Sequence, residues 1–150
     1  MERFKIAKMT ENISAISKGM QTVGTSKNHQ VIIDEPQQMG GTDEGANPLA
    51  TLLISLAGCE NAIANMVAKE INFDLQGINF VIQGELDTDG MMGKEGVLPY
   101  FQTININVKV KTSESENRIQ ELQNIVDSRC PVFTTLEAAK TVMVPNWTKA

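Results

Sequence analysis

The two cysteines are the side chains of this sequence best suited to covalent chemistry. Cys59 lies in the apolar stretch LLISLAGCENAIANM, and Cys130 directly precedes Pro131. A thiolate attacks electrophilic oxygen or sulfur, and two thiols that meet can form a disulfide. Each cysteine also has a simpler interpretation, because free cysteine is among the most buried residue types and packs as a small apolar side chain. They are 71 positions apart (130 minus 59), so only the fold can bring them together.

Three polar residues are candidates to support a thiol. Arg129 precedes Cys130 and is the best basic candidate near a sulfur, although a surface ion pair is the commoner role for such a residue. His29 is the only histidine; a cation there could lower the pKa of a nearby thiol, and a surface or hydrogen-bonded role is the alternative. Glu60 follows Cys59 but points about 100° away around a helix, so we expect it to face solvent or an interface.

The sequence offers no recognisable metal or cofactor motif. The acids Asp34, Glu35, Asp43 and Glu44 cluster in one loop without regular ligand spacing, so we expect them to be solvated. One histidine and two cysteines make a zinc site improbable. Met91 and Met92 are expected to pack within a loop, or to line a pocket for an apolar tail. We therefore expect no metal and no cofactor.

Composition predicts one folded, soluble domain over residues 1–150. The chain has 41% hydrophobic and 21% charged residues, close to globular averages. Its net charge is -5 and its basic residues are scattered, which disfavours a nucleic-acid partner. The amino terminus lacks the apolar core of a signal peptide, and the run Leu49 to Cys59 is shorter than the roughly 20 residues of a membrane span. We expect a cytoplasmic protein without a membrane partner.

Residues 1 to 34 are expected to form an antiparallel meander. Phe4 and Ile6 alternate with polar residues, Gly19 and Gly24 are turn signals, and the run His29 to Asp34 carries a further alternation. A long, Gly-rich acidic loop follows.

A helix is predicted to begin at Asn47 and Pro48, a capping residue and a proline at the first helical position, and to continue to about Ile71. Its first turns are apolar nearly all round, so the helix must be enclosed on several sides, which suggests a second subunit.

The rest of the chain alternates strands with helices. The predicted segments are a strand in Leu75 to Thr88, an irregular loop DGMMGKEGVLP, a strand in Gln102 to Lys111, a helix from the Ser113 and Glu116 capping box to Cys130, a helical turn near Leu136 to Lys140, and a strand in Thr141 to Trp147.

Several motifs together resemble the OsmC-like family of osmotically induced and organic hydroperoxide resistance proteins. They are NPLATLLISLAGC followed by ENAIANMVAKE, the distant RCPVFTTL, the late VMVPNW, and the preceding DEP and GGTD. The resemblance covers about Asp34 to Trp147. It implies an OsmC-like α+β fold with antiparallel sheets around a long central helix, an intertwined homodimer, and thiol peroxidase activity toward organic hydroperoxides.

By that likeness, Cys59 matches the peroxidatic cysteine and Cys130 the resolving cysteine of the family. A peroxidatic thiolate becomes a sulfenic acid, which condenses with the second thiol before it is oxidised further. A disulfide requires Cα atoms within roughly 4.4 to 6.8 Å of each other. The implied partners are a second copy of the chain, a small apolar hydroperoxide or other apolar ligand, and a dithiol reductant.

Two family features are missing from their expected places. Family peroxidases pair the reactive cysteine with an arginine of the amino-terminal sheet and a glutamate just after the Asn-Pro step, where this chain has Leu49 and Ala50. Arg3 is too early in the chain, which leaves Lys27 and His29 as the nearest cations. We therefore predict weak or altered peroxidase activity. The alternative is a non-catalytic dimer of the same fold that binds an apolar small molecule, or a slow thiol redox sensor.

Overall fold

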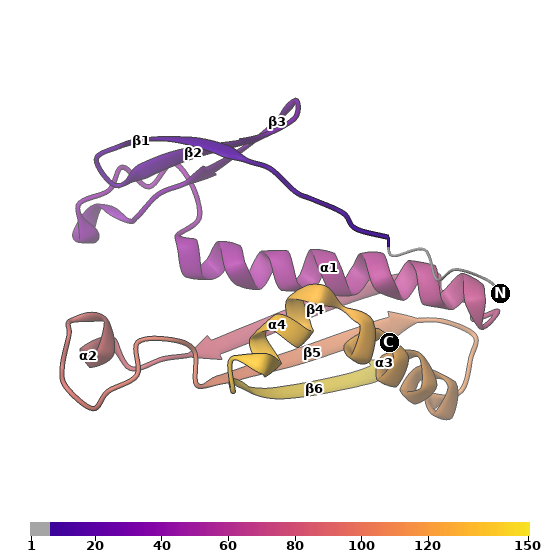
Figure 1. Cartoon of the computed structure of the whole chain (residues 1–150). Helices are drawn as coiled ribbons and strands as arrows, with labels where there is room; N and C mark the ends of the chain where they lie inside the picture. Colours follow the sequence, from indigo (N-terminus) through magenta and orange to yellow (C-terminus); the bar gives the residue numbers. More distant parts are fainter. Residues whose placement is uncertain (1–6) are drawn as a thin grey trace, which may run out of the picture. The chain divides into compact units, whose positions relative to one another are not determined.

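The computed structural model describes residues 7–150 and divides into two compact units, Met1–Thr51 and Leu52–Ala150 (Figure 1). The expected strand residues Phe4 and Ile6, together with Arg3, lie outside the described residues.

The first unit contains an antiparallel meander, as expected, with strand order β1-β2-β3. Its strands are β1 (Ser14–Lys18), β2 (Gln21–Ser26) and β3 (His29–Ile33). Gly19 forms the first turn with a φ of 59°, a left-handed conformation that glycine adopts without strain. The turn expected at Gly24 was wrong. Gly24 lies inside β2 opposite Ala15, and the second turn instead has Lys27 at a φ of 55°.

The loop after β3 is built around the carboxylate of Asp34. The structure buries Asp34 to 1% exposure, so the expectation that it is solvated was wrong. Its oxygens accept hydrogen bonds from Thr42 Oγ1 at 2.6 Å, the Glu35 amide at 2.8 Å, the Glu44 amide at 3.2 Å and Gln21 Nε2 at 3.3 Å. The Thr42 hydroxyl, followed by the backbone donors, holds the pKa of Asp34 well below its usual value. This acid therefore organises the loop, which also includes the short helix η1 (Gln37–Met39).

The long helix α1 (Pro48–Glu70) has the ends that the sequence predicts to within one residue. Asn47 Oδ1 accepts a hydrogen bond of 2.7 Å from the Ala50 amide, which satisfies a free donor of the first turn. One stripe of the helix is buried, formed by Leu56, Glu60, Ala64, Val67 and Ala68.

By length and composition alone, α1 is also apolar enough to cross a membrane, with a mean hydropathy of 1.3 over an 18-residue window. The run from Leu49 to Cys59, on which the expectation of no membrane span was based, is only part of this helix. The helix contributes Leu56 and Val67, both fully buried, to the same core cluster as the second sheet. The opposite side of the helix is exposed in this chain, at residues such as Ile54 and Met66.

The second unit contains a three-stranded sheet of order β4-β5-β6, with β4 (Gly77–Glu85), β5 (Thr103–Lys111) and β6 (Val142–Lys149). β4 and β5 are antiparallel, whereas β5 and β6 are parallel. The expected antiparallel arrangement therefore holds for β4 and β5, and the parallel strand β6 makes this sheet mixed. Two parallel neighbours need a crossover connection, which the helices between β5 and β6 supply.

One face of this sheet forms the core. Ile104, Ile106, Val108 and Val110 are at most 1% exposed, and the residues between them on β5 are polar. Trp147 of β6 packs edge-on to Phe80 of β4, with ring centroids 6.4 Å apart. The alternation predicted from the sequence correctly separates the two faces.

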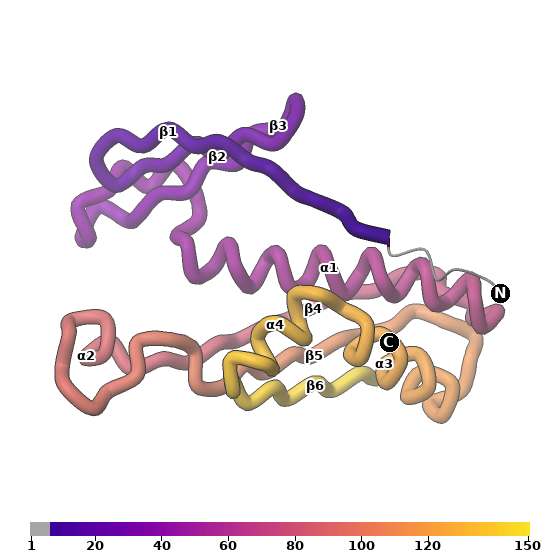
Figure 2. Tube along the Cα trace, viewed as in Figure 1, coloured from indigo at the N-terminus to yellow at the C-terminus, as the bar shows by residue number. Residues whose placement is uncertain are grey.

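Helices α3 (Glu116–Arg129) and α4 (Pro131–Ala138) connect β5 to β6 (Figure 2). α3 ends at Cys130 as predicted, but its cap is Ser115 and not Ser113, which instead donates to Asp74 at 2.6 Å. α4 begins at Pro131, earlier than the predicted turn. In the loop expected to be irregular, Asp87 caps the single-turn helix α2 (Thr88–Met91).

Candidate redox site

The structure brings Cys59 and Cys130 together. Cys59 lies in the middle of α1 and is half-buried, and Cys130 lies at the α3–α4 junction and is fully buried. Cys59 is one of the groups that raise the pKa of the Cys130 thiol, so the two side chains are near neighbours, and both are free thiols. Both belong to the second unit, and α1 and α3 carry them into one core cluster. Two residues far apart along the chain therefore meet as a dithiol.

The helix junction fixes the position of the Cys130 sulfur. The Cys130 amide donates to Val126 O at 2.8 Å and closes the last turn of α3. Its backbone is extended, with a φ of -71° and a ψ of 116°, as expected for a residue before proline. Sγ then accepts a hydrogen bond of 3.5 Å from the Phe133 amide and so caps α4. Cys130 thus ends one helix and begins the next.

The surroundings of Cys130 favour the neutral thiol. Burial is the main cause that raises its pKa to about 12. The Phe133 amide opposes this shift, whereas Cys59 and the negative charge of Glu60 add to it. At neutral pH Cys130 is therefore a poor first nucleophile.

Glu60, next to Cys59, lies in a different environment from the one expected for it. We expected it to face solvent or an interface, but the structure buries it completely. The helical spacing predicts this burial, because Glu60 lies one turn after the buried Leu56 and one turn before the buried Ala64. The angle between Glu60 and Cys59 around the helix, taken alone, wrongly predicted exposure.

Glu60 of α1 meets Asp127 of α3 in the protein interior. Both Glu60 oxygens and Asp127 Oδ1 are buried without a hydrogen-bond donor. Burial, followed by the charge of Asp127, raises the pKa of Glu60 to about 8. Burial also raises the pKa of Asp127 to about 6, against the hydrogen bonds from Glu60 and Gln123. At neutral pH the pair therefore holds one proton, which provides the missing hydrogen bond.

Arg129 is directed away from the thiols into an ion pair. Its Nη1 and Nη2 atoms donate to the two oxygens of Glu70 at 2.6 and 3.0 Å. The ion pair raises the pKa of Arg129 and lowers that of Glu70. Within residues 7–150, Arg129 is not one of the groups that shift the pKa of Cys130. The structure thus shows the surface alternative for this residue.

Two further features expected near the thiols are His29 and a carboxylate in the first turn of α1. His29 is exposed at the start of β3, opposite Ser26, in the first unit. The first turn of α1 contains Leu49 and Ala50 and no acidic residue, so the carboxylate expected there from the family is absent from this turn.

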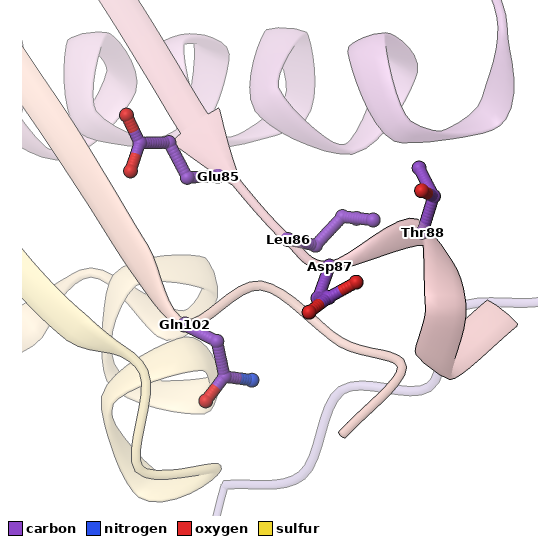
Figure 3. Close-up of a pocket in the computed structure, with 5 residues that line it drawn as sticks. All are labelled: Glu85, Leu86, Asp87, Thr88 and Gln102. Atoms are coloured by element: carbon purple, nitrogen blue, oxygen red, sulfur yellow. The ribbon is translucent and has the colours of Figure 1, made fainter. Parts of the chain in front are cut away.

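The described residues contain no cluster of three or more His, Cys, Asp or Glu side chains arranged to hold a metal. A hollow of about 400 Å³ lies at the end of β4, lined by Glu85, Leu86, Asp87, Thr88 and Gln102 (Figure 3). Glu85 points away from Asp87 and Gln102 in this view, and no thiol lines the hollow. This pocket therefore has no set of converging groups.

Comparison with known proteins places these features in context. Residues 41–144 match the family described as OsmC-like protein. The hydroperoxide reductase of Mycoplasma pneumoniae is 30% identical over 103 residues, which cover 69% of this chain and 70% of that protein. The hydroperoxide reductase of Mycoplasma genitalium is 31% identical over 112 residues, 74% of each chain.

Solved structures show the same fold. The crystal structure of an OsmC-like protein from Mycoplasma pneumoniae has a TM-score of 0.82 and 26% identity, and covers 96% of this chain and 99% of that one. A hypothetical protein from Aquifex aeolicus has a TM-score of 0.76 at 14% identity, with coverage of 95% and 98%. These similarities support the α+β architecture, including the mixed sheet and the long helix.

Proposed function

Because the chain belongs to the OsmC-like family, we propose that it is a thiol-dependent peroxidase that reduces organic hydroperoxides. Two relatives that each match about two thirds or more of the chain are named hydroperoxide reductase. The observation that carries the proposal is the proximity of a half-buried Cys59 to a fully buried Cys130.

In the proposed reaction, the Cys59 thiolate attacks the outer oxygen of the hydroperoxide. The O–O bond breaks, the alkoxide leaves and takes up a proton as an alcohol, and Cys59 becomes a sulfenic acid. The Cys130 sulfur then attacks the Cys59 sulfur and releases water, with the thiol proton joining the departing hydroxyl. A dithiol reductant reopens the Cys59–Cys130 disulfide by thiol exchange.

The missing family residues lead us to propose a slow enzyme. An ordinary thiol is a few per cent ionised at pH 7, so full ionisation adds at most roughly 30-fold in reactive species, under about 2.5 kcal/mol. Further acceleration requires positioned donors that stabilise charge on the leaving oxygen. The first turn of α1 has no carboxylate to position such a donor, and Arg129 is paired with Glu70.

We also propose that the active form is a homodimer in a reducing compartment. Apolar side chains remain exposed along α1, including Leu52, Ile54 and Met66. A second copy would cover them and could provide an apolar surface for the organic part of a substrate.

One experiment tests the redox function directly. Reduced protein is treated with one equivalent of cumene hydroperoxide, followed by intact mass analysis and thiol counting. We expect the loss of two hydrogen atoms and of both thiols. The Cys59→Ser variant should consume no peroxide, and the Cys130→Ser variant should stop at a sulfenic acid that dimedone traps.

An unchanged mass with both thiols intact would refute the peroxidase proposal. It would favour the alternative, an apolar-ligand-binding dimer of the same fold.

A further inference from the structure

We infer that Glu60 controls how readily Cys130 attacks Cys59, through a proton that Glu60 shares with Asp127. The inference rests on the proposed function, because it takes Cys59 and Cys130 as the reacting pair. Glu60 is a positioning residue in this scheme, since it acts on the Cys130 thiol through its charge and contacts no substrate.

The carboxyl pair joins the two helices that carry the thiols. Glu60 directly follows Cys59 on α1, and Asp127 lies about one turn before Cys130 on α3. Both Glu60 oxygens and Asp127 Oδ1 are buried without a hydrogen-bond partner, and each carboxyl group is among those that shift the pKa of the other. Two ionised carboxylates have no donor for each other, so this arrangement favours a state that retains a proton.

No described cation neutralises this pair. The groups that shift the pKa of Glu60, Asp127 or Cys130 are one another, Cys59, Gln123, Glu137 of α4 and the Phe133 amide. Gln123 Nε2 donates to Asp127 Oδ2 at 3.4 Å, and Glu137 adds a further negative charge. A negative charge on Glu60 therefore destabilises the Cys130 thiolate, and no described cation offsets this effect.

The consequence is a specific pH profile. An isolated thiol well below its pKa gains roughly tenfold in thiolate for each pH unit. Glu60 loses its proton at a pKa of about 8, and its charge then makes the Cys130 thiolate less favourable. The rate of Cys130 attack should therefore rise less than tenfold per unit above about pH 8.

Attack by Cys130 can be isolated with 4,4′-dithiodipyridine, which needs no hydroperoxide. Cys59 first displaces one pyridinethione and forms a mixed disulfide. Cys130 then attacks the Cys59 sulfur, closes the protein disulfide and releases the second thione, which takes up the thiol proton. The first absorbance phase reports Cys59, and the second reports Cys130.

Two variants should change the second phase in opposite directions. Glu60→Gln keeps a hydrogen-bond donor for Asp127 but cannot become charged. If the Glu60 charge raises the pKa of the Cys130 thiol by one unit, the second phase at pH 9 should be roughly fivefold faster in this variant than in the parent, with little change at pH 6.5.

Asp127→Asn removes the like charge and offers an amide donor to Glu60. Glu60 then ionises at lower pH, so the second phase should be slower at pH 7. Glu70→Gln is the matched control on the exposed part of α1, and should leave the profile unchanged.

Three outcomes would overturn the inference. At pH 9, they are an unchanged second phase in Glu60→Gln, a slower second phase, or equal acceleration of both phases. Should Glu60→Gln fail to fold, as judged by circular dichroism, the direction of the Asp127→Asn change decides the matter.

Failure of the inference can be separated from failure of the proposed function. Closure of the disulfide by the aromatic reagent without consumption of cumene hydroperoxide would reject the peroxidase and leave the role of Glu60 testable. Consumption of the hydroperoxide with identical pH profiles in all variants would reject only the role of Glu60.

Discussion

The buried pair of Glu60 and Asp127 makes the stability of the protein depend on pH. The pKa of Glu60 rises from 4.5 in the unfolded chain to about 8 in the fold, and that of Asp127 from 3.8 to about 6. Below the pKa values of the unfolded chain, Glu60 and Asp127 are protonated in both the folded and the unfolded state, so their titration does not favour unfolding. As the pH rises toward 8, the unfolded chain binds fewer protons than the folded one, so the free energy of unfolding falls.

We therefore predict that the parent protein, kept reduced, is less stable at pH 8 than at pH 5. The decrease contributed by one such carboxyl is at most about 1.4 kcal/mol for each pH unit. In Glu60→Gln the decrease should be much smaller, because the variant has no proton to lose at this position. Urea unfolding at pH 5, 6.5 and 8 measures it.

Glu70→Gln provides the control for this prediction. The pKa of Glu70 is lowered by Arg129, so this residue favours the folded state above its unfolded pKa and should not reproduce the loss toward pH 8. Parallel stability curves for the parent and Glu60→Gln would show that Glu60 does not hold a proton in the fold.

At the scale of single residues, the sequence was informative where a motif or local geometry decided the outcome. The family motifs singled out Cys59 and Cys130, which the fold places near each other, and Pro131 predicted the extended backbone before it. Adjacency in sequence was a poor guide to side-chain partners. Arg129 pairs with Glu70, and Glu60 interacts with Asp127, because tertiary packing determines which side of a helix is buried.

At the scale of elements, local chemistry predicted the ends of α1 and the alternation of β4 and β5. Asn47 supplies a cap, and alternating side chains decide which face of a strand is buried. The parallel pairing of β6 with β5 depends on a crossover and has no local signal. The early start of α4 also depends on tertiary contacts, since Cys130 caps it from the core.

The sheet of the second unit allows a matched test of this alternation. Ile106 of β5 is 1% exposed on the core face, whereas Val81 of β4 is 71% exposed on the other face. Ile106→Ala should lower the free energy of unfolding by about 2–5 kcal/mol, because it leaves a cavity. Val81→Ala should change it by about 0.5 kcal/mol or less. Urea denaturation checks both, and equal losses would contradict the assignment of faces.

At the scale of the whole molecule, disulfide formation involves one chain, whereas the exposed side of α1 is the surface proposed to contact a second copy. Both cysteines lie in the second unit of a single chain, so formation of their disulfide does not require a second copy. The exposed apolar residues of α1 have no such internal partner among the interactions described for them. Composition predicted a folded chain, and the spacing of apolar residues predicted the apolar circumference of the helix. Neither could indicate which side of the helix the sheet would leave exposed.

We predict that Ile54→Lys converts a homodimer of the 16.4 kDa chain into a monomer, as measured by light scattering after size exclusion. Ile54 is 62% exposed in the single chain, and a buried lysine at a subunit contact would be strongly unfavourable. Val81→Lys makes a similar change at the more exposed position on the sheet and should leave the mass unchanged. The monomer should still close its disulfide with 4,4′-dithiodipyridine, because both thiols belong to one chain. The monomer should consume less cumene hydroperoxide, because the proposed apolar surface for the substrate needs both protomers. A monomeric parent protein, or full peroxidase activity in a monomeric variant, would exclude a role for the dimer in substrate binding.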